Sequence, residues 1–284
     1  MDTISDPSPV QRRALSAPEC YVLVYGWSPF NEPLKLAFAE LVARDVLQIV
    51  EAQGKRGLLG KLHPVSVFTD GPNSEVSLQR PLRAAFDLYK KAPSHSPSAG
   101  ISVVAIDSLG GVVRKKYRDH RGFLKSEVMP PLVEKGLFRA ENKRTLFLFP
   151  SKRFVRTPEG DTAAAEIEGW LSMNQEAFGE MASSDPKRAF RFVQQAGPAI
   201  LLMKDLHPQI RELRQSVGQP TGGFTDATIF PVGGSGDRFD MPDLDFGVFS
   251  AIDSAFDAIA SGFDFGGGGD GGGGNGGGGN GGGG

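Results

Sequence analysis

The sequence predicts a mainly α-helical protein with small β-hairpins, built from two winged-helix-like modules in tandem and a C-terminal helical subdomain. The strongest indication is the stretch 128–149 (VMPPLVEKGLFRAENKRTLFLF). A helix there is predicted to end at Lys135 and Gly136, because a cation in the last turn and a glycine just beyond it are common stop signals. A strand, a polar turn at 141–144 and an apolar returning strand at 145–149 follow. This order is typical of the third helix and wing of a winged helix.

A weaker copy of this pattern lies 91 residues earlier, where 41–47 (LVARDVL) parallels 132–138 (LVEKGLF) in its apolar positions. Apolar residues recur at helical spacing from Leu34 to Val42, which predicts a helix before this copy too. Strands at 46–50 and 65–68, with a glycine-containing turn between them, complete a first hairpin. We therefore predict two related helix–hairpin modules.

The region between the two hairpins holds a helix and an ambiguous segment. Apolar residues from Leu78 to Tyr89 recur at helical spacing, with Pro81 near the first turn, where proline is tolerated. Residues 93–100 (PSHSPSAG) are predicted to form a loop. The Ile and Val content of 101–113 favours a strand, but its place early in a module favours a helix, which is our prediction.

Three helices are predicted after the second hairpin. The first covers 162–181. The second runs from Asp185 to Gln195, because a capping aspartate followed by proline starts a helix. A Gly-Pro pair separates it from a last helix that ends near Gln215, and the periodicity is lost beyond Gly218.

A chain of 284 residues is long enough for more than one structural unit and a sizeable core. Its longest apolar runs fall far below the roughly 20 residues of a spanning helix, so we predict a cytoplasmic protein that is either soluble or peripheral on a membrane. The single cysteine, Cys20, is predicted to pack in the core. The predicted units are a flexible N-terminus (1–19), a first winged-helix-like module (20–76), a second (77–156), C-terminal helices (157–217) and a disordered acidic, aromatic and Gly-rich tail (218–284).

Charge is unevenly distributed along the chain. Residues 112–156 contain thirteen Lys or Arg and four Asp or Glu, a net charge of +9, whereas 237–284 contain eight Asp and one Arg, a net charge of −7. This division predicts a basic binding face and a solvated acidic tail. The acidic, phenylalanine-rich part of the tail either forms a short helix around residues 249–259 or stays a disordered peptide that docks on the basic face or on a protein partner.

The sequence has no catalytic or metal-binding signature. Residues 54–62 (GKRGLLGKL) resemble a phosphate-binding Walker A loop, but five residues separate the outer glycines and no Ser or Thr follows the lysine. The four histidines stand alone, without zinc-site spacing or a second cysteine. We therefore predict a non-catalytic protein without a cofactor or a metal.

Residues 114–121 (RKKYRDHR), with Lys125, form a dense basic cluster. One interpretation is a solvated helix face, and the other is a site for lipid phosphates or another polyanion, since such contacts need cations but no reaction geometry. A DNA-binding winged-helix regulator is therefore an alternative function, and a protein-interaction scaffold is another. Sequence-specific DNA binding is less favoured, because the helices before both hairpins carry Ala, Pro and Glu where Arg, Asn or Gln would read bases.

The predicted strand of the second hairpin is apolar on both faces. Its residues either pack on the core and under the following helices, or contact a membrane or a partner with flanking cations as anchors. The candidate membrane-contact residues are Leu146, Phe147, Leu148 and Phe149.

From Trp27 to about Leu213, the order of these features resembles the Golgi phosphoprotein 3 family and its bacterial relatives. The stretches that carry the resemblance are 39–44 (AELVAR), 81–91, 132–138 leading into 146–149, and the helix that starts at Asp185. The tail lies outside the family pattern. The resemblance implies a mostly helical fold that binds phosphatidylinositol 4-phosphate on membranes.

The family's head-group pocket, transferred by position, falls near Trp27, Lys35, Arg121 and Lys125. Lysine at two of these positions keeps the charge but loses the forked guanidinium that clamps a phosphate. The resemblance and the basic cluster together define the predicted anion site: Trp27, Lys35, Arg114, Lys115, Arg118, Arg121 and Lys125.

Overall fold

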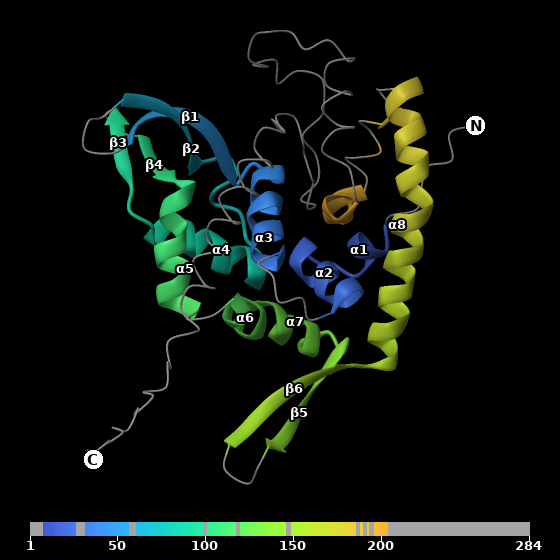
Figure 1. The fold of residues 1–284 in the computed structure, drawn as a ribbon. Coiled ribbons are helices and arrows are strands. Elements are labelled where there is room, and N and C mark those ends of the chain that lie inside the picture. The colour runs from blue at the N-terminus through green and yellow to red at the C-terminus, as the bar shows by residue number, and fades with distance from the viewer. Residues whose placement is uncertain are drawn as a thin grey trace, which may run out of the picture.

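The computed structural model describes residues 8–26, 32–56, 61–98, 101–117, 120–145, 149–185, 188–189, 192 and 196–203. Over these residues the fold is mainly helical with small antiparallel strand pairs, which confirms the predicted fold class at that level (Figure 1). The long helix α8 (Pro158–Ser184) flanks the short helices of the N-terminal part, and the hairpin of β5 (Phe138–Thr145) and β6 (Phe149–Arg156) projects away from the body.

The remaining elements complete the chain order. The helices are α1 (Pro9–Arg12), α2 (Ala17–Tyr25), α3 (Glu32–Ala43), α4 (Arg80–Lys91), α5 (Leu109–Tyr117), α6 (His120–Phe123) and α7 (Met129–Glu134), with 3-10 turns η1 (Ile106–Ser108) and η3 (Gly197–Leu202) and a π-helical turn η2 (Leu124–Val128). The strands β1 (Leu47–Arg56), β2 (Lys61–Asp70), β3 (His95–Ser98) and β4 (Ile101–Ala105) form one sheet in the order β1-β2-β4-β3.

The two helix–hairpin units end their helices in the same way. In the first unit the Val46 N–H donates to Leu41 O at 2.9 Å, and 91 residues later the Leu137 N–H donates to Leu132 O, also at 2.9 Å. The residue before each donor is left-handed: Asp45 has φ 54° and Gly136 has φ 73°. This is the Schellman arrangement that stops a helix and turns the chain. The internal repeat seen in the sequence is therefore also a repeat of backbone structure.

In each unit, the first residue after the helix end also accepts a hydrogen bond from the residue that follows the hairpin. The Gly71 N–H donates to Val46 O at 3.0 Å, and the Thr157 N–H donates to the equivalent Leu137 O at 3.1 Å. A glycine packs against this backbone in both units, because a Cβ added at Gly71 would overlap the carbonyl of Asp45 and one added at Gly160 would overlap that of Leu137. Each hairpin thus returns to the end of the helix that precedes it.

Alanine at Gly160 is expected to lower the free energy of unfolding by about 1–3 kcal/mol, the usual cost of overpacking. Its Cβ would lie 2.7 Å from Arg156 Cγ and closer still to Leu137 O. Gly169 in the same helix is the matched control, because a Cβ there meets nothing within 4 Å. Alanine at Gly169 is expected to stabilise α8 by about 0.5–1 kcal/mol. Urea unfolding of both variants measures the difference, and equal effects would contradict the close packing at Gly160.

The core centres on α3, where ten of twelve residues are buried. The Phe38 ring stacks on Phe68 of β2 at 5.3 Å between centroids, and Tyr89 of α4 meets Phe68 edge-on at 6.4 Å. Each buried phenyl ring contributes about 1.5–3 kcal/mol of transfer free energy. On the other side α2 packs on α8, so α3 is enclosed between the sheet and the helices.

Three predicted features are wrong within the described residues. Residues 101–105 form β4 rather than a helix, and 95–98 form β3 rather than a loop, because β4 pairs with both β3 and β2. The helix predicted over 101–113 begins only at Leu109. Residues 8–19 are packed rather than flexible, since Val10 and Leu15 are buried.

The second hairpin also differs from its prediction. Residues 141–144 lie within β5, where Glu141 pairs with Arg153 and Arg144 with Pro150, instead of forming a turn. A hairpin that projects from the body has little core to cover, so polar residues are tolerated along its strands. Residues 146–148 lie outside the described part of the chain, and Phe149 begins β6.

The first two predicted C-terminal helices agree with the prediction where they are described. The first, α8, begins earlier than expected because Thr157 caps it, its Oγ1 accepting a hydrogen bond from the Gly160 N–H at 3.1 Å. Asp185 caps the next helical segment through the Arg188 N–H at 3.1 Å. The predicted last helix is wrong where it is described, because the 3-10 turn η3 ends at Leu202 and Met203 is extended. Residues 204–284, with the predicted tail, lie outside the described residues.

Candidate anion-binding surface

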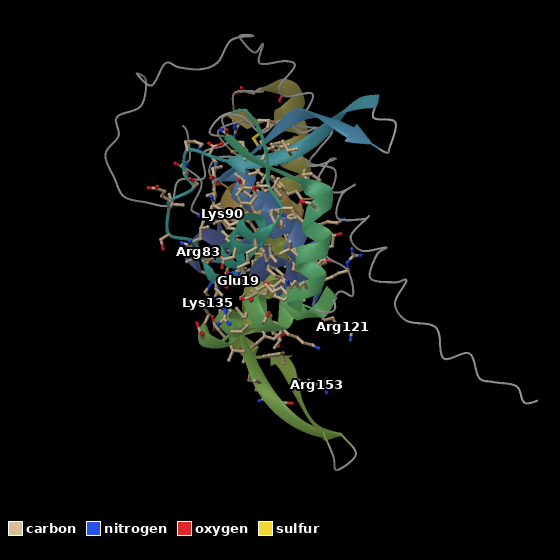
Figure 2. All side chains as sticks on the ribbon, turned by 90° about the vertical axis from the view of Figure 1, so that its left-hand side faces the viewer. Glu19, Arg83, Lys90, Arg121, Lys135 and Arg153 are labelled. Carbon is tan, nitrogen blue, oxygen red and sulfur yellow. The ribbon has the colours of Figure 1, made fainter. Side chains whose placement is uncertain are left out.

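Four of the predicted cations lie on three connected helical segments. Arg114 and Lys115 occupy the last turn of α5, Arg121 lies on α6, and Lys125 lies on η2; all four are exposed. We call these four residues the basic surface. Figure 2 shows Arg121 on one side of the molecule, with Arg83 of α4 on the other side of that view.

Aromatic packing holds α5 against α6. The Tyr117 ring meets Phe123 edge-on at 5.6 Å between centroids. Gly122 makes this approach possible, because a Cβ at that position would lie 2.7 Å from Tyr117 Cβ and would overlap Tyr117 O. The corner between the two helices is therefore close-packed, and it brings the cations of α5 near those of α6.

Pro130 changes the helical geometry between α6 and α7. Pro130 has no N–H for the carbonyl of Ser126, four residues earlier, and its ring would clash with that carbonyl in a regular helix. The chain widens into the π turn η2, in which the Met129 N–H reaches back to Leu124 O. Ser126 O instead accepts a hydrogen bond from Arg80 Nη2 of α4 at 2.8 Å. The carbonyl that Pro130 leaves unpaired in the helix therefore binds Arg80, and this hydrogen bond joins η2, which carries Lys125, to α4.

Glu127 joins α4, α5 and η2 through its two carboxylate oxygens. Its Oε1 accepts from the Tyr117 hydroxyl at 3.3 Å and lies 3.7 Å from Lys116 Nζ, while Oε2 lies 3.4 Å from Arg80 Nε. Burial, together with Glu127, raises the pKa of Tyr117 well above its usual value, so this hydroxyl stays protonated and donates. Lys116 and Arg80 are engaged by this carboxylate. Arg80 is a contact residue that the sequence did not indicate.

The other predicted site residues are placed differently. Lys35 lies in α3 with 9% of its surface exposed and pairs with Glu32 at 3.3 Å, so it is less accessible than the four cations of the basic surface. Trp27 and Arg118 lie outside the described residues. The same holds for Leu146, Phe147 and Leu148 of the predicted membrane contact.

The β5–β6 hairpin adds further cations below the helices. Arg139 pairs with Glu141 at 2.9 Å and Arg156 lies 3.5 Å from Asp161. Arg153 is exposed and lies on the same side as Arg121 in the view of Figure 2. The hairpin therefore extends the positive charge away from the body.

A second group of charged residues lies between α2, α3 and the end of α7, and its two carboxylates are buried. Glu40 accepts from the Ala17 N–H at 2.6 Å and from Arg44 Nη2 at 2.7 Å, and Glu19 accepts from Lys135 Nζ at 2.7 Å. Arg44 and Lys135 occupy equivalent positions of the repeat. Each unit thus supplies one cation to a buried carboxylate, Arg44 to Glu40 of α3 and Lys135 to Glu19 of α2. We call Glu19, Glu40, Arg44 and Lys135 the buried charge cluster, after its two buried carboxylates.

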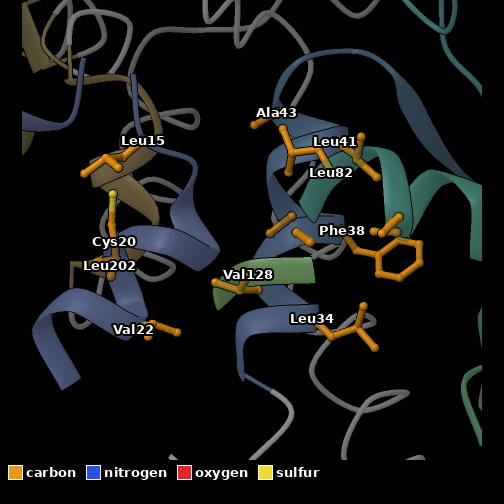
Figure 3. Packing of buried hydrophobic residues seen from close by; sticks show 14 of the residues in the cluster. Leu15, Cys20, Val22, Leu34, Phe38, Leu41, Ala43, Leu82, Val128 and Leu202 are labelled. Carbon is orange, nitrogen blue, oxygen red and sulfur yellow. The ribbon is translucent and has the colours of Figure 1, made fainter. Parts of the chain in front are cut away.

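The buried charge cluster links α2 to α3 and to the end of α7 through its hydrogen bonds. Both carboxylates are fully buried, and burial raises the pKa of Glu40 above 4.5 although Arg44 and the Ala17 N–H oppose the shift. The neighbouring Cys20 lies in the core beside Leu202 (Figure 3), and burial raises the pKa of its thiol. A buried, protonated thiol is a poor nucleophile. The prediction that Cys20 packs in the core is confirmed.

The described residues contain no group of three or more His, Cys, Asp or Glu that could hold a metal ion. Among the helices of that part of the chain, none has the length and apolar character needed to cross a bilayer. Comparison of the sequence with models of known protein families and with curated proteins finds no match.

Proposed function

We propose that the protein binds anionic membrane surfaces peripherally and without catalysis, through the basic surface and the adjacent hairpin. The observation that supports this most is the exposure of Arg114, Lys115, Arg121 and Lys125 on helical segments that pack against one another. Clustered cations near an anionic membrane contribute about 1 kcal/mol each. The apolar residues 146–149 at the end of the hairpin would supply the part that enters the bilayer interface.

The tandem winged-helix-like interpretation belongs to this proposal. Its support is the repeated helix end, in which Leu41 and Leu132 accept equivalent bonds before each hairpin. The resemblance to the Golgi phosphoprotein 3 family adds a phosphoinositide as a candidate head group. Because Lys35 is buried, we propose anionic phosphate head groups in general as the ligand.

The burial pattern favours a membrane over a DNA groove. In a winged-helix regulator the helix before a hairpin enters the major groove and must expose one face. Here α3 has ten of twelve residues buried, and α7 is six residues long with Met129, Pro131 and Leu132 buried. Neither helix presents a face that reads bases.

Co-sedimentation with vesicles tests this function. The full chain is expected to sediment with vesicles that contain phosphatidylserine or a phosphoinositide and to remain in solution with phosphatidylcholine alone. Binding should weaken with salt, because exposed charges are screened over about 8–10 Å near physiological ionic strength. Duplex DNA is the competitor: displacement at a lower concentration than soluble phosphate head groups would contradict the membrane proposal and support the DNA regulator.

A further inference from the structure

The basic surface has an acidic counterpart in its own chain. The four exposed cations of α5, α6 and η2 face solvent in the described part of the protein. Residues 237–264 contain seven aspartates and one arginine, a net charge of −6. The charge on this segment is opposite in sign to that of the surface and exceeds it in magnitude.

We propose that the segment 237–264 docks on the basic surface of the same molecule when no other polyanion is bound. The proposal deepens the function above, because the segment and a membrane would compete for the same cations. Docking would lower the affinity for weakly anionic membranes and leave binding to strongly anionic ones. The segment therefore acts as an internal competitor that sets the charge density at which the protein binds.

The chain can make this contact within one molecule. The last described residue, Met203, follows η3, and residues 204–236 connect it to the acidic segment. A connection of 33 residues can span up to roughly 100 Å when extended. This distance exceeds the diameter of a compact domain of roughly 200 residues. Tethering gives an effective concentration of the order of millimolar, so even weak contacts are populated.

The segment also carries an apolar pattern suited to docking. Phe249, Ile252, Phe256 and Ile259 recur at a spacing of three and four residues, the spacing of one helix face. On the body, Val112 lies one helical turn before Lys115 on α5 and is half-buried against the core, so part of one apolar side chain is exposed beside these cations.

Fluorescence anisotropy of the full chain tests the proposal without lipid. Cys20 is fully buried, so a dye coupled to a Ser261→Cys variant labels the tail alone. A docked tail is expected to give high anisotropy at low salt. In about 1 M salt, where the Debye length is about 3 Å, the anisotropy should fall to that of the labelled peptide 237–265 in solution.

Variants on both partners locate the contact. Lys115→Glu with Lys125→Glu should release the dye at low salt, as should Asp253→Asn with Asp257→Asn in the tail. Arg83→Glu with Lys91→Glu on α4 removes the same charge and should leave the anisotropy unchanged.

Anisotropy that is low in the wild type, or unchanged by both the basic-surface and the tail variants, would overturn the proposal. A dependence on protein concentration would overturn it in favour of a second copy. Because no vesicle is present, failure of membrane binding leaves this result unaffected.

Discussion

Replacing Lys115 and Lys125 together with glutamate is expected to weaken binding to anionic vesicles by roughly 100- to 1,000-fold. The two substitutions remove two cations and add two anions, and each charge near the membrane contributes about 1 kcal/mol, while 1.4 kcal/mol is a factor of ten. Both side chains are exposed, so the fold should be unaffected. The measurement is the bound fraction against lipid concentration, with circular dichroism to verify folding.

The control for this prediction has the same net charge in another place. Arg83 and Lys91 are exposed on α4, and Figure 2 shows Arg83 away from Arg121. Arg83→Glu with Lys91→Glu should lower binding by less than about tenfold, through the long-range field alone. Equal losses in the two variants would mean that net charge, rather than the basic surface, governs binding.

Glu40→Ala is expected to lower the free energy of unfolding by roughly 3–5 kcal/mol, the cost of removing one partner from a buried charge pair. The substitution leaves the Ala17 N–H without its acceptor and Arg44 without its carboxylate, and it opens a cavity at a fully buried position. Glu141→Ala, which breaks the exposed pair with Arg139 in the hairpin, should cost less than about 1 kcal/mol. Urea unfolding compares the two variants, and similar costs would contradict a structural role for the buried charge cluster.

The raised pKa of Glu40 determines the direction in which stability should change with pH. Because burial raises the pKa of Glu40, the folded state keeps a proton that the unfolded state has released above about pH 4.5. The contribution of this group to stability is therefore greatest below that pH and is lost as the pH rises through the folded pKa. The stability of the wild type relative to Glu40→Gln should fall over this range. A constant difference would show that the folded pKa is not raised.

The repeated units were predictable because their signals are local. A glycine after a basic last turn marks Gly136, and apolar spacing marks both helices, so neither depends on distant contacts. The local Ile and Val content of 101–105 favours a strand, but its pairing partner lies in another part of the chain, where Phe68 pairs with Val104. The polar stretch 141–144 predicts a turn because it lacks apolar residues, although a strand in a projecting hairpin does not require them.

The positive charge of the candidate site was predictable from the sequence, but the contacts that position its cations were not. The density of Lys and Arg indicated the cations of α5 and α6 directly. The contact of Arg80 with Ser126 and the burial of Lys35 depend on how α3 and α4 pack, which no local pattern encodes. Glu19 and Glu40 have the residue type of a surface position, and their burial is compensated by the equivalent cations of the two units together with the N–H groups of Ser16 and Ala17.

The most direct test of the proposed surface is hydrogen–deuterium exchange of the full chain with and without phosphatidylserine vesicles. We expect the vesicles to slow amide exchange in residues 109–128 and 138–156, which carry the basic surface and the hairpin. Exchange in α8 should be unchanged. Protection confined to α8 or to the sheet of β1–β4, in a sample that sediments with the vesicles, would contradict the account and place the membrane contact elsewhere.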